Sequence, residues 1–257
     1  MRHKGIVTFP SRESLPKIML FDLDDTIVDY SRRGRESWIE VCEEHSNAAT
    51  PFDPAAMFTT ITSVSAWFWS DEERFRVGRL DLDEARRVVC RYALERTGID
   101  DKALADAMGT AYARKRDEAC RLLPGARDTL ETLRSLEVPL GLITNGGVEK
   151  QRGKIRRFDL GAYFQLIVIE GEFGTGKPDL RVYRHALEFF SVSASDACMV
   201  GDNLDWDVAA PQALGIQGIW HDYRGKGLPG DSNVRPDRIV RSIAELVGYG
   251  RDSSTSH

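Results

Sequence analysis

The sequence predicts an α/β protein in which an all-helical segment interrupts a doubly wound parallel sheet. From about residue 123 onward, short apolar stretches alternate with helical patterns, which is typical of parallel strands covered by helices on both faces. Between residues 30 and 122, apolar residues instead recur at three- and four-residue spacing, which indicates helices. An apolar stretch before this segment supplies the first strand.

That first strand is predicted at KIMLFDL, residues 17–23, and it runs directly into acidic residues. The interrupting segment contains three clear helical patterns, SRRGRESWIEVCEEH, LDEARRVVCRYALERTG and ALADAMGTAYARKRDEAC. Later strands are predicted at VPLGLIT, FQLIVIE, ACMVGD, GIQGIW and DRIV, and the helices among them at ARDTLETLRSL, residues 148–158, LRVYRHALEFF and DVAAPQALG.

These elements divide the chain into a core and an insertion. We expect a Rossmann-like core of residues 17–29 and 123–250, with a helical domain of residues 30–122 inserted into it. Residues 1–16 are expected to form an N-terminal extension and residues 251–257 a loose tail.

Composition and charge exclude several classes of partner. The chain has 257 residues, 42% of them hydrophobic and 29% charged, as in an ordinary globular protein. Its net charge of -5 argues against nucleic acid or an anionic membrane as the main partner, and no apolar run could span a bilayer. The N-terminal stretch MRHKGIVTFPSRESLP lacks the apolar core of a signal peptide. The oligomeric state is left open.

The cysteines indicate a reducing compartment. Cys42, Cys90, Cys120 and Cys198 are scattered, without a CxxC pair or neighbouring histidines. A disulfide framework or a zinc site is therefore not expected, and buried free thiols in a cytoplasmic protein are the better interpretation.

Polar residues gather where the predicted strands end. They are Asp22 and Asp24 after the first strand, Thr144 and Asn145 after LGLI, Lys177 in the loop after IVIE, and Asp202 and Asp207 after CMVG. Each alone has a simpler explanation, since an Asp often caps a helix and Thr or Asn often forms a turn. Ligands bind at the carboxyl ends of such strands, however, so together these residues predict a site.

The clustered acids predict a metal. Two carboxylates about 4 Å apart repel each other by about 4 kcal/mol at an effective dielectric constant of 20. Asp22, Asp24 and Asp202 therefore need cations nearby, and Lys177 supplies one. An oxygen-ligated Mg²⁺ is the natural second cation, because it binds carboxylates together with water and phosphate.

The stretch GEFGTGKPD, residues 171–179, could be mistaken for a nucleotide-binding P-loop. Pro178 stands where that motif has Ser or Thr, so the hydroxyl group that would bind magnesium is missing. Lys177 is better interpreted as the cation that neutralises the acids and a bound phosphate.

Four motifs in this order resemble those of the haloacid dehalogenase (HAD) superfamily. FDLDDTIVD has the pattern DxDxT, LITNG places a Thr after a strand, GKPD places a Lys before Pro, and GDNLDWDVAAPQALG has the pattern GDxxxxD. The resemblance covers residues 17–220, and only Leu180 departs from it, where relatives commonly have Pro. The inserted segment resembles the helical cap of the family's first subclass.

The resemblance implies a role for each site residue. Asp22 would be the nucleophile that forms an aspartyl-phosphate, and Asp24 the general acid and base. Mg²⁺ would be held by the Asp22 and Asp202 carboxylates and the Asp24 backbone carbonyl. Thr144, Asn145 and Lys177 would bind phosphate, and Asp207 would orient Lys177 or a metal-bound water.

Asp24 also separates the possible reactions. Dehalogenases have a different residue two positions after the nucleophile, so phosphoryl chemistry is favoured over dehalogenation. We expect a Mg²⁺-dependent phosphatase that hydrolyses a small phosphorylated metabolite. The alternatives are a phosphomutase of the same fold, a 2-haloacid dehalogenase, and a phospho-accepting signalling or binding protein.

Four further features are interpreted as structural. Asp25 is expected to point away from the site, and Asp205 to face solvent. The aromatic stretch SAWFWS, residues 65–70, is expected mainly to pack the inserted helices. The basic residues from Lys150 to Arg157 are expected to form the wet face of a helix.

Overall fold

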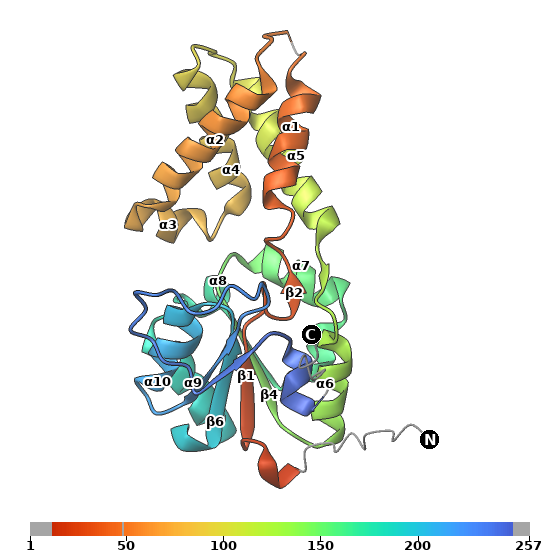
Figure 1. Ribbon diagram of the computed structural model, residues 1–257, viewed down its shortest axis with the longest axis vertical. Helices are drawn as coiled ribbons and strands as arrows, with labels where there is room; N and C mark the ends of the chain where they lie inside the picture. Colours follow the sequence, from red (N-terminus) through yellow and green to blue (C-terminus); the bar gives the residue numbers. More distant parts are fainter. Residues whose placement is uncertain (1–11, 48, 249–257) are drawn as a thin grey trace, which may run out of the picture. The chain divides into compact units, whose positions relative to one another are not determined.

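The computed structural model describes residues 12–47 and 49–248 (Figure 1). The predicted tail, and most of the predicted N-terminal extension, lie outside these residues. The chain divides into two compact units. Of the described residues, 30–47, 49–120 and 146–148 form the helical unit, and 12–29, 121–145 and 149–248 form the core unit.

The core unit is built on a six-stranded parallel sheet, which confirms the predicted α/β fold. Its strands are β1 (Ile18–Phe21), β4 (Leu140–Thr144), β5 (Leu166–Ile169), β6 (Ala197–Gly201), β7 (Gln217–His221) and β8 (Arg238–Val240). Their order is β5-β4-β1-β6-β7-β8, so β1 is a central strand. All four residues of β1 are buried apolar side chains, as expected for a strand covered on both faces.

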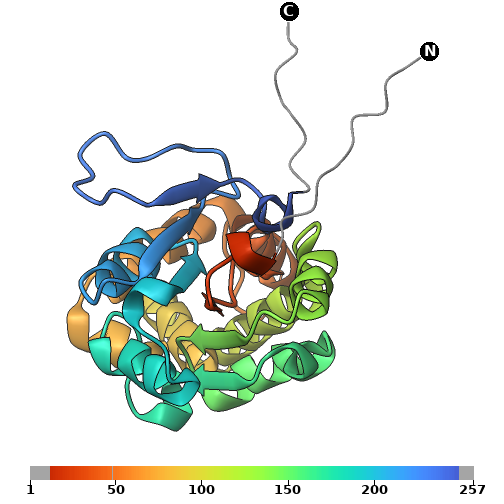
Figure 2. The ribbon, with the colours of Figure 1, turned by 90° about the horizontal axis from the view of Figure 1, so that it is seen from below.

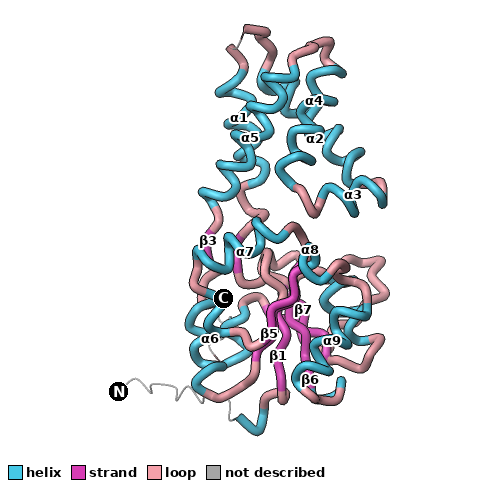
Figure 3. Tube along the Cα trace, turned by 180° about the vertical axis from the view of Figure 1, so that it is seen from behind, coloured by secondary structure: helices cyan, strands magenta, loops and turns pink. Residues whose placement is uncertain are grey.

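Helices cover both faces of this sheet (Figure 3). The core helices are α6 (Ala126–Ser135), α7 (Val148–Arg157), α8 (Glu170–Phe173), α9 (Leu180–Phe190) and α10 (Ala210–Gln212), with short 3₁₀ turns at Arg12–Ser14, Leu160–Tyr163, Ala194–Asp196 and Ile243–Val247. On one face, Val182 and Tyr183 of α9 pack against Leu20 and Met199 of the sheet. Figure 2 shows the long loop between β7 and β8 at one edge of the sheet.

One core helix begins earlier than predicted. The stretch DVAAPQALG was expected to be helical, but the chain already turns as a π-helix over Leu204–Ala209 and then continues into α10. Asn203 causes the early start, because its side-chain oxygen accepts hydrogen bonds from the backbone N–H groups of Asp205 and Trp206.

The helical unit contains α1 (Gly34–His45), α2 (Pro54–Trp69), α3 (Glu72–Gly78), α4 (Leu82–Arg96) and α5 (Lys102–Ala119). An aspartate caps the start of four of these helices, each accepting a backbone N–H three residues on: Asp53, Asp71, Asp81 and Asp101. Phe68 is buried in the core of this unit, and Trp67 and Trp69 pack against that core. The aromatic stretch therefore packs the helices, as predicted.

Where the chain passes between the units, it forms a two-stranded antiparallel pair, β2 (Val28–Asp29) and β3 (Arg121–Leu122). Two-residue strands leave no periodic signal in a sequence, so this pair was not predicted.

All four cysteines are buried thiols, which confirms the prediction of buried free thiols. No helix among the described residues is both long and apolar enough to span a membrane.

Candidate active site

Asp22 lies at the carboxyl end of the central strand β1, and its carboxylate is held from two sides. Its backbone N–H donates to the Val200 carbonyl at 2.9 Å, which extends the pairing with β6 beyond Phe21. Thr26 donates its hydroxyl to Asp22 Oδ2 at 3.0 Å, and Lys177 Nζ donates to Oδ1 at 2.7 Å. This buried carboxylate is therefore fixed in one orientation.

Lys177 is a fully buried cation between two acids. Its side chain is 1% exposed, and Nζ lies 2.7 Å from Asp22 and 2.6 Å from Asp207. Burial opposes the ammonium charge, but Asp207 and Asp22 outweigh that effect, so the pKa of Lys177 lies above its ordinary value. The lysine stays charged inside the protein.

The loop that presents Lys177 is clamped by Asn145 at the end of β4. The Asn145 side-chain amide donates to the Lys177 carbonyl at 2.7 Å, and its oxygen accepts the Lys177 N–H at 2.8 Å. A Cβ at Gly176 would come within 2.5 Å of this Asn145 oxygen, so the close approach requires glycine. The Asn145 side chain thus positions Lys177, and phosphate binding by Asn145 stays a prediction.

Asp207 is also committed to Lys177. One carboxylate oxygen accepts from Lys177 Nζ, and the other accepts the Asn203 backbone N–H at 3.0 Å. A Cβ at Gly201, the last residue of β6, would lie 2.2 Å from the Asp207 carboxyl carbon. Glycine at this position lets Asp207 reach across the end of the strand.

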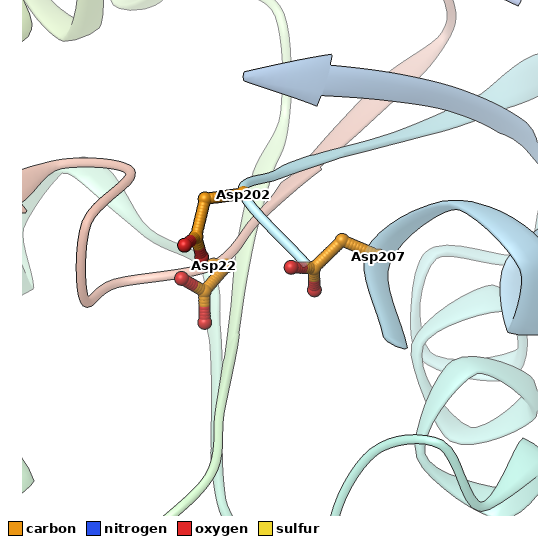
Figure 4. A group of neighbouring side chains, drawn as sticks. All are labelled: Asp22, Asp202 and Asp207. Atoms are coloured by element: carbon orange, nitrogen blue, oxygen red, sulfur yellow. The ribbon is translucent and has the colours of Figure 1, made fainter. Parts of the chain in front are cut away.

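Three acids converge at this edge of the sheet: Asp22, Asp202 and Asp207 (Figure 4). One oxygen of each lies within 4.8 Å of those of the others. Burial, together with the neighbouring Asp207, outweighs Lys177 and raises the pKa of Asp22 to about 7. Burial and the nearby Asp22 raise the pKa of Asp202 to about 9. Without a further cation these two acids therefore tend to keep their protons, because Lys177 alone cannot offset three ionised carboxylates.

This excess of acid fits a divalent cation. Asp202 is the least buried of the three acids, so its carboxylate is the most open to a metal ion, and an Asp22 oxygen lies within 4.8 Å of it. Carboxylate oxygens of this kind are the ligands that Mg²⁺ prefers. Asp202 is held in place because its backbone carbonyl accepts the Trp220 indole N–H at 2.8 Å.

The Asp24 carboxylate is bound by two residues of α7. Lys154 Nζ lies 2.6 Å from both Asp24 oxygens, and the Gln151 amide lies 3.1 Å from Oδ2. Gln151 also contacts the Thr144 hydroxyl at 2.6 Å, which links α7 to the end of β4. Asp24 and Thr144 thus share one hydrogen-bonded network.

The wet-face interpretation of α7 is wrong for Lys154. Its side chain is only 8% exposed, whereas Arg156 and Arg157 of the same helix are exposed. Burial of this lysine is possible because Asp24 offsets its charge. One pattern in the sequence could have indicated this burial. A spacing of three and four residues places Gln151, Lys154 and Ile155 on one face of the helix.

The prediction that Asp25 points away from the site is wrong. Asp25 is buried and, with Asp202 and Asn203, lines a cavity of about 540 Å³ that also includes the loop after β7. Its backbone φ of 62° turns the chain at this point, where its N–H donates to the Val28 carbonyl. Asp205 is exposed, as expected.

Comparison with known proteins identifies the family. The family profile "haloacid dehalogenase-like hydrolase" matches residues 16–215. A phosphoserine phosphatase of Thermus thermophilus is 32% identical over 90% of this chain and 97% of its own length. A glyceraldehyde 3-phosphate phosphatase of Pyrococcus furiosus is 28% identical, covering 90% and 91%. The crystal structure of a 2-haloacid dehalogenase of Pseudomonas syringae pv. Tomato superimposes with a TM-score of 0.62 at 26% identity, covering 90% of this chain and 96% of that one.

The chain belongs to the haloacid dehalogenase-like hydrolase family. The predicted resemblance is thereby confirmed, and the chain spans nearly the whole length of the relatives named above.

Proposed function

We propose that this protein is a Mg²⁺-dependent phosphomonoester hydrolase that transfers the phosphoryl group of a small phosphorylated metabolite to Asp22. The family is one of hydrolases, and the relatives from Thermus thermophilus and Pyrococcus furiosus are phosphatases, so the protein is an HAD-type phosphatase. The observation that carries the proposed mechanism is the Asp22 carboxylate, buried at the tip of the central strand beside Lys177 and Asp202. We place the enzyme in the cytoplasm, where its free thiols stay reduced.

The reaction proceeds in two displacements. An Asp22 carboxylate oxygen attacks phosphorus, the bond to the ester oxygen breaks, and Asp24 gives its proton to the departing alkoxide. Water then attacks the aspartyl-phosphate and transfers a proton to Asp24, which releases inorganic phosphate and restores Asp22. The Lys177 ammonium offsets negative charge beside Asp22 in both steps.

A magnesium ion bound by Asp22, Asp202 and the Asp24 carbonyl would screen the nucleophile from the phosphoryl oxygens. We therefore expect exhaustive chelation with EDTA to reduce turnover to the background level, and added Mg²⁺ to restore it. Phosphate release from a panel of phosphorylated metabolites measures this, with Asp22→Asn as the background control. Full activity after chelation would contradict the metal requirement.

The same panel tests the proposed reaction. The expected product is inorganic phosphate together with the free alcohol. An isomeric phosphate ester would instead identify a phosphomutase. Stable phosphorylation of the protein without turnover would identify a phospho-accepting protein.

We expect Lys154 to position Asp24 for proton transfer. Replacing Lys154 by Met should lower kcat/KM for alkyl phosphates about a hundredfold, because an alkoxide leaving group needs a proton from Asp24. The kcat/KM for p-nitrophenyl phosphate should change little, since p-nitrophenolate leaves without one.

Arg156→Met is the matched control for this prediction, because Arg156 is an exposed cation on the same helix. That variant should leave both kinds of substrate unaffected. An equal fall for alkyl and aryl esters in Lys154→Met would mean that Lys154 acts only on the fold or on phosphate binding.

A further inference from the structure

The Gln151 side-chain amide lies at the centre of the network that joins α7 to the end of β4. Its nitrogen is 2.6 Å from the Thr144 hydroxyl oxygen, 2.8 Å from the Asn145 backbone carbonyl and 3.1 Å from Asp24 Oδ2. All four residues belong to the core unit, and Gln151 is only 2% exposed, so these contacts are shielded from solvent. An amide nitrogen carries two hydrogens, however, and this one faces three oxygen atoms.

The orientation of the amide follows from these neighbours. The Asn145 carbonyl and the Asp24 carboxylate are acceptors, so an amide turned by about 180° would place its own oxygen against two other oxygens. The nitrogen must therefore face this side, as the structure has it. Gln151 can only donate to the three oxygens, and it has one hydrogen too few to serve all of them.

The two hydrogens go to Thr144 and Asn145. These are the two shorter contacts of the amide nitrogen. The contact with Asp24 is the longest, and both Asp24 oxygens already lie 2.6 Å from the Lys154 ammonium group. Thr144 Oγ1 is therefore the acceptor in its hydrogen bond with Gln151, because the amide nitrogen cannot accept.

This direction leaves the hydrogen of the Thr144 hydroxyl for another partner. Thr144 is 2% exposed, and no acceptor for this hydrogen lies within hydrogen-bond distance among the residues that the structure describes. Buried hydroxyl groups normally have a partner, so a ligand atom is expected to accept the hydrogen. Thr144 lies two residues beyond Leu142, which pairs with Phe21, so it ends its strand at the edge where Asp22 begins the site.

We propose that Gln151 is a positioning residue that makes the Thr144 hydroxyl a hydrogen-bond donor to the phosphate group of the substrate. A phosphate dianion offers only acceptor oxygens, so a hydroxyl binds it only when the hydroxyl hydrogen points toward it. Because Gln151 donates to Thr144 Oγ1, it fixes that direction before the substrate arrives. This inference rests on the proposed phosphatase function, and it adds to that function a residue outside the four sequence motifs.

Replacing Gln151 by Met tests this role, because Met has nearly the same length but no donor. The Thr144 hydroxyl can then turn its hydrogen away from the ligand. We expect the dissociation constant of inorganic phosphate, measured by calorimetry with Mg²⁺ present, to rise roughly ten- to hundredfold, which corresponds to one charged hydrogen bond. The kcat/KM for p-nitrophenyl phosphate should fall by a similar factor.

A double-mutant cycle shows whether Gln151 acts through Thr144. In Thr144→Val the hydroxyl is already absent, so adding Gln151→Met should change the dissociation constant of phosphate by less than about twofold. Thr144→Ser keeps the hydroxyl, so in that background Gln151→Met should again weaken phosphate binding by roughly tenfold or more. Thermal unfolding of each variant shows whether the core unit is intact.

Gln217→Met is the matched control. It is the same substitution at an exposed glutamine at the start of β7, the opposite end of the sheet from the site, and it should bind phosphate as the wild type does.

Three outcomes would overturn the proposal. The first is an undiminished effect of Gln151→Met in the Thr144→Val background, since Gln151 would then only support the fold. The second is a fall in kcat/KM confined to alkyl phosphates with unchanged phosphate binding, since Gln151 would then act on Asp24. The third is a wild type that does not bind phosphate. The phosphatase function fails separately, if the wild type binds phosphate but does not hydrolyse p-nitrophenyl phosphate with Mg²⁺ present.

Discussion

Replacing Asp22 by Asn is expected to lower kcat for phosphomonoester hydrolysis roughly ten-thousandfold or more, because an amide cannot take up the phosphoryl group. The Asn side chain has nearly the same shape, and Lys177 keeps its contact with Asp207, so the fold should be retained. Loss of a buried carboxylate should even leave the free energy of unfolding unchanged or raised. Turnover of p-nitrophenyl phosphate and urea unfolding measure the two effects.

A covalent readout makes this test specific to the nucleophile. Wild-type protein quenched in acid during turnover should carry an alkali-labile phosphate on the peptide that contains Asp22, and Asp22→Asn should carry none. Asp205→Asn is the control, because Asp205 is an exposed acid near the same edge of the sheet. Activity of Asp22→Asn within about tenfold of wild type, a difference of only about 1.4 kcal/mol, would remove Asp22 as the nucleophile.

Replacing Lys177 by Met is expected to abolish activity and to destabilise the protein by about 3–5 kcal/mol. Without the ammonium group, Asp22 and Asp207 would be buried near each other with no neutralising cation. Metal-free protein shows this effect best, because a bound divalent ion would replace part of the lost positive charge. Urea unfolding in EDTA, followed by added Mg²⁺, measures both contributions.

A second substitution distinguishes the charge effect from a packing defect. In Lys177→Met/Asp207→Asn, one buried acid is removed as well, so part of the lost stability should return while activity stays absent. Lys17→Met is the surface control, since Lys17 is 66% exposed beside Asp196 and should contribute less than about 1 kcal/mol. A loss of under about 1 kcal/mol in Lys177→Met would contradict the buried charge network.

The parts of the site that the sequence could predict are those that follow strands. Asp22, Thr144 and Asp202 each come directly after a buried apolar run, and parallel strands bring their carboxyl ends to one edge. Lys177 follows β5 through the short helix α8, so its loop was predicted at this edge too. This rule depends only on where the strands end, so it can be applied to a sequence before the position of any side chain is known.

Lys154 and Gln151 could not be found in that way. They lie on a helix, where burial of one face depends on what packs against it. Their partner Asp24 is 130 residues away from Lys154 in sequence. Asp25 illustrates the same limit, because it lines one cavity together with the loop after β7, which is far from it in sequence. Local sequence patterns predict helices and strands, whereas these contacts form only when segments that are far apart in the sequence pack together.

The antiparallel pair of β2 and β3 has a consequence for how such enzymes diversify. Val28 lies opposite Leu122, and Asp29 lies opposite Arg121, so the chain leaves the core and returns to it at neighbouring points. Residues paired across two strands are only about 5 Å apart. The inserted helices therefore occupy the position of a hairpin turn, and another folded segment with adjoining ends could replace them without shifting the register of β1. The reaction chemistry can be inherited unchanged while the insertion is exchanged.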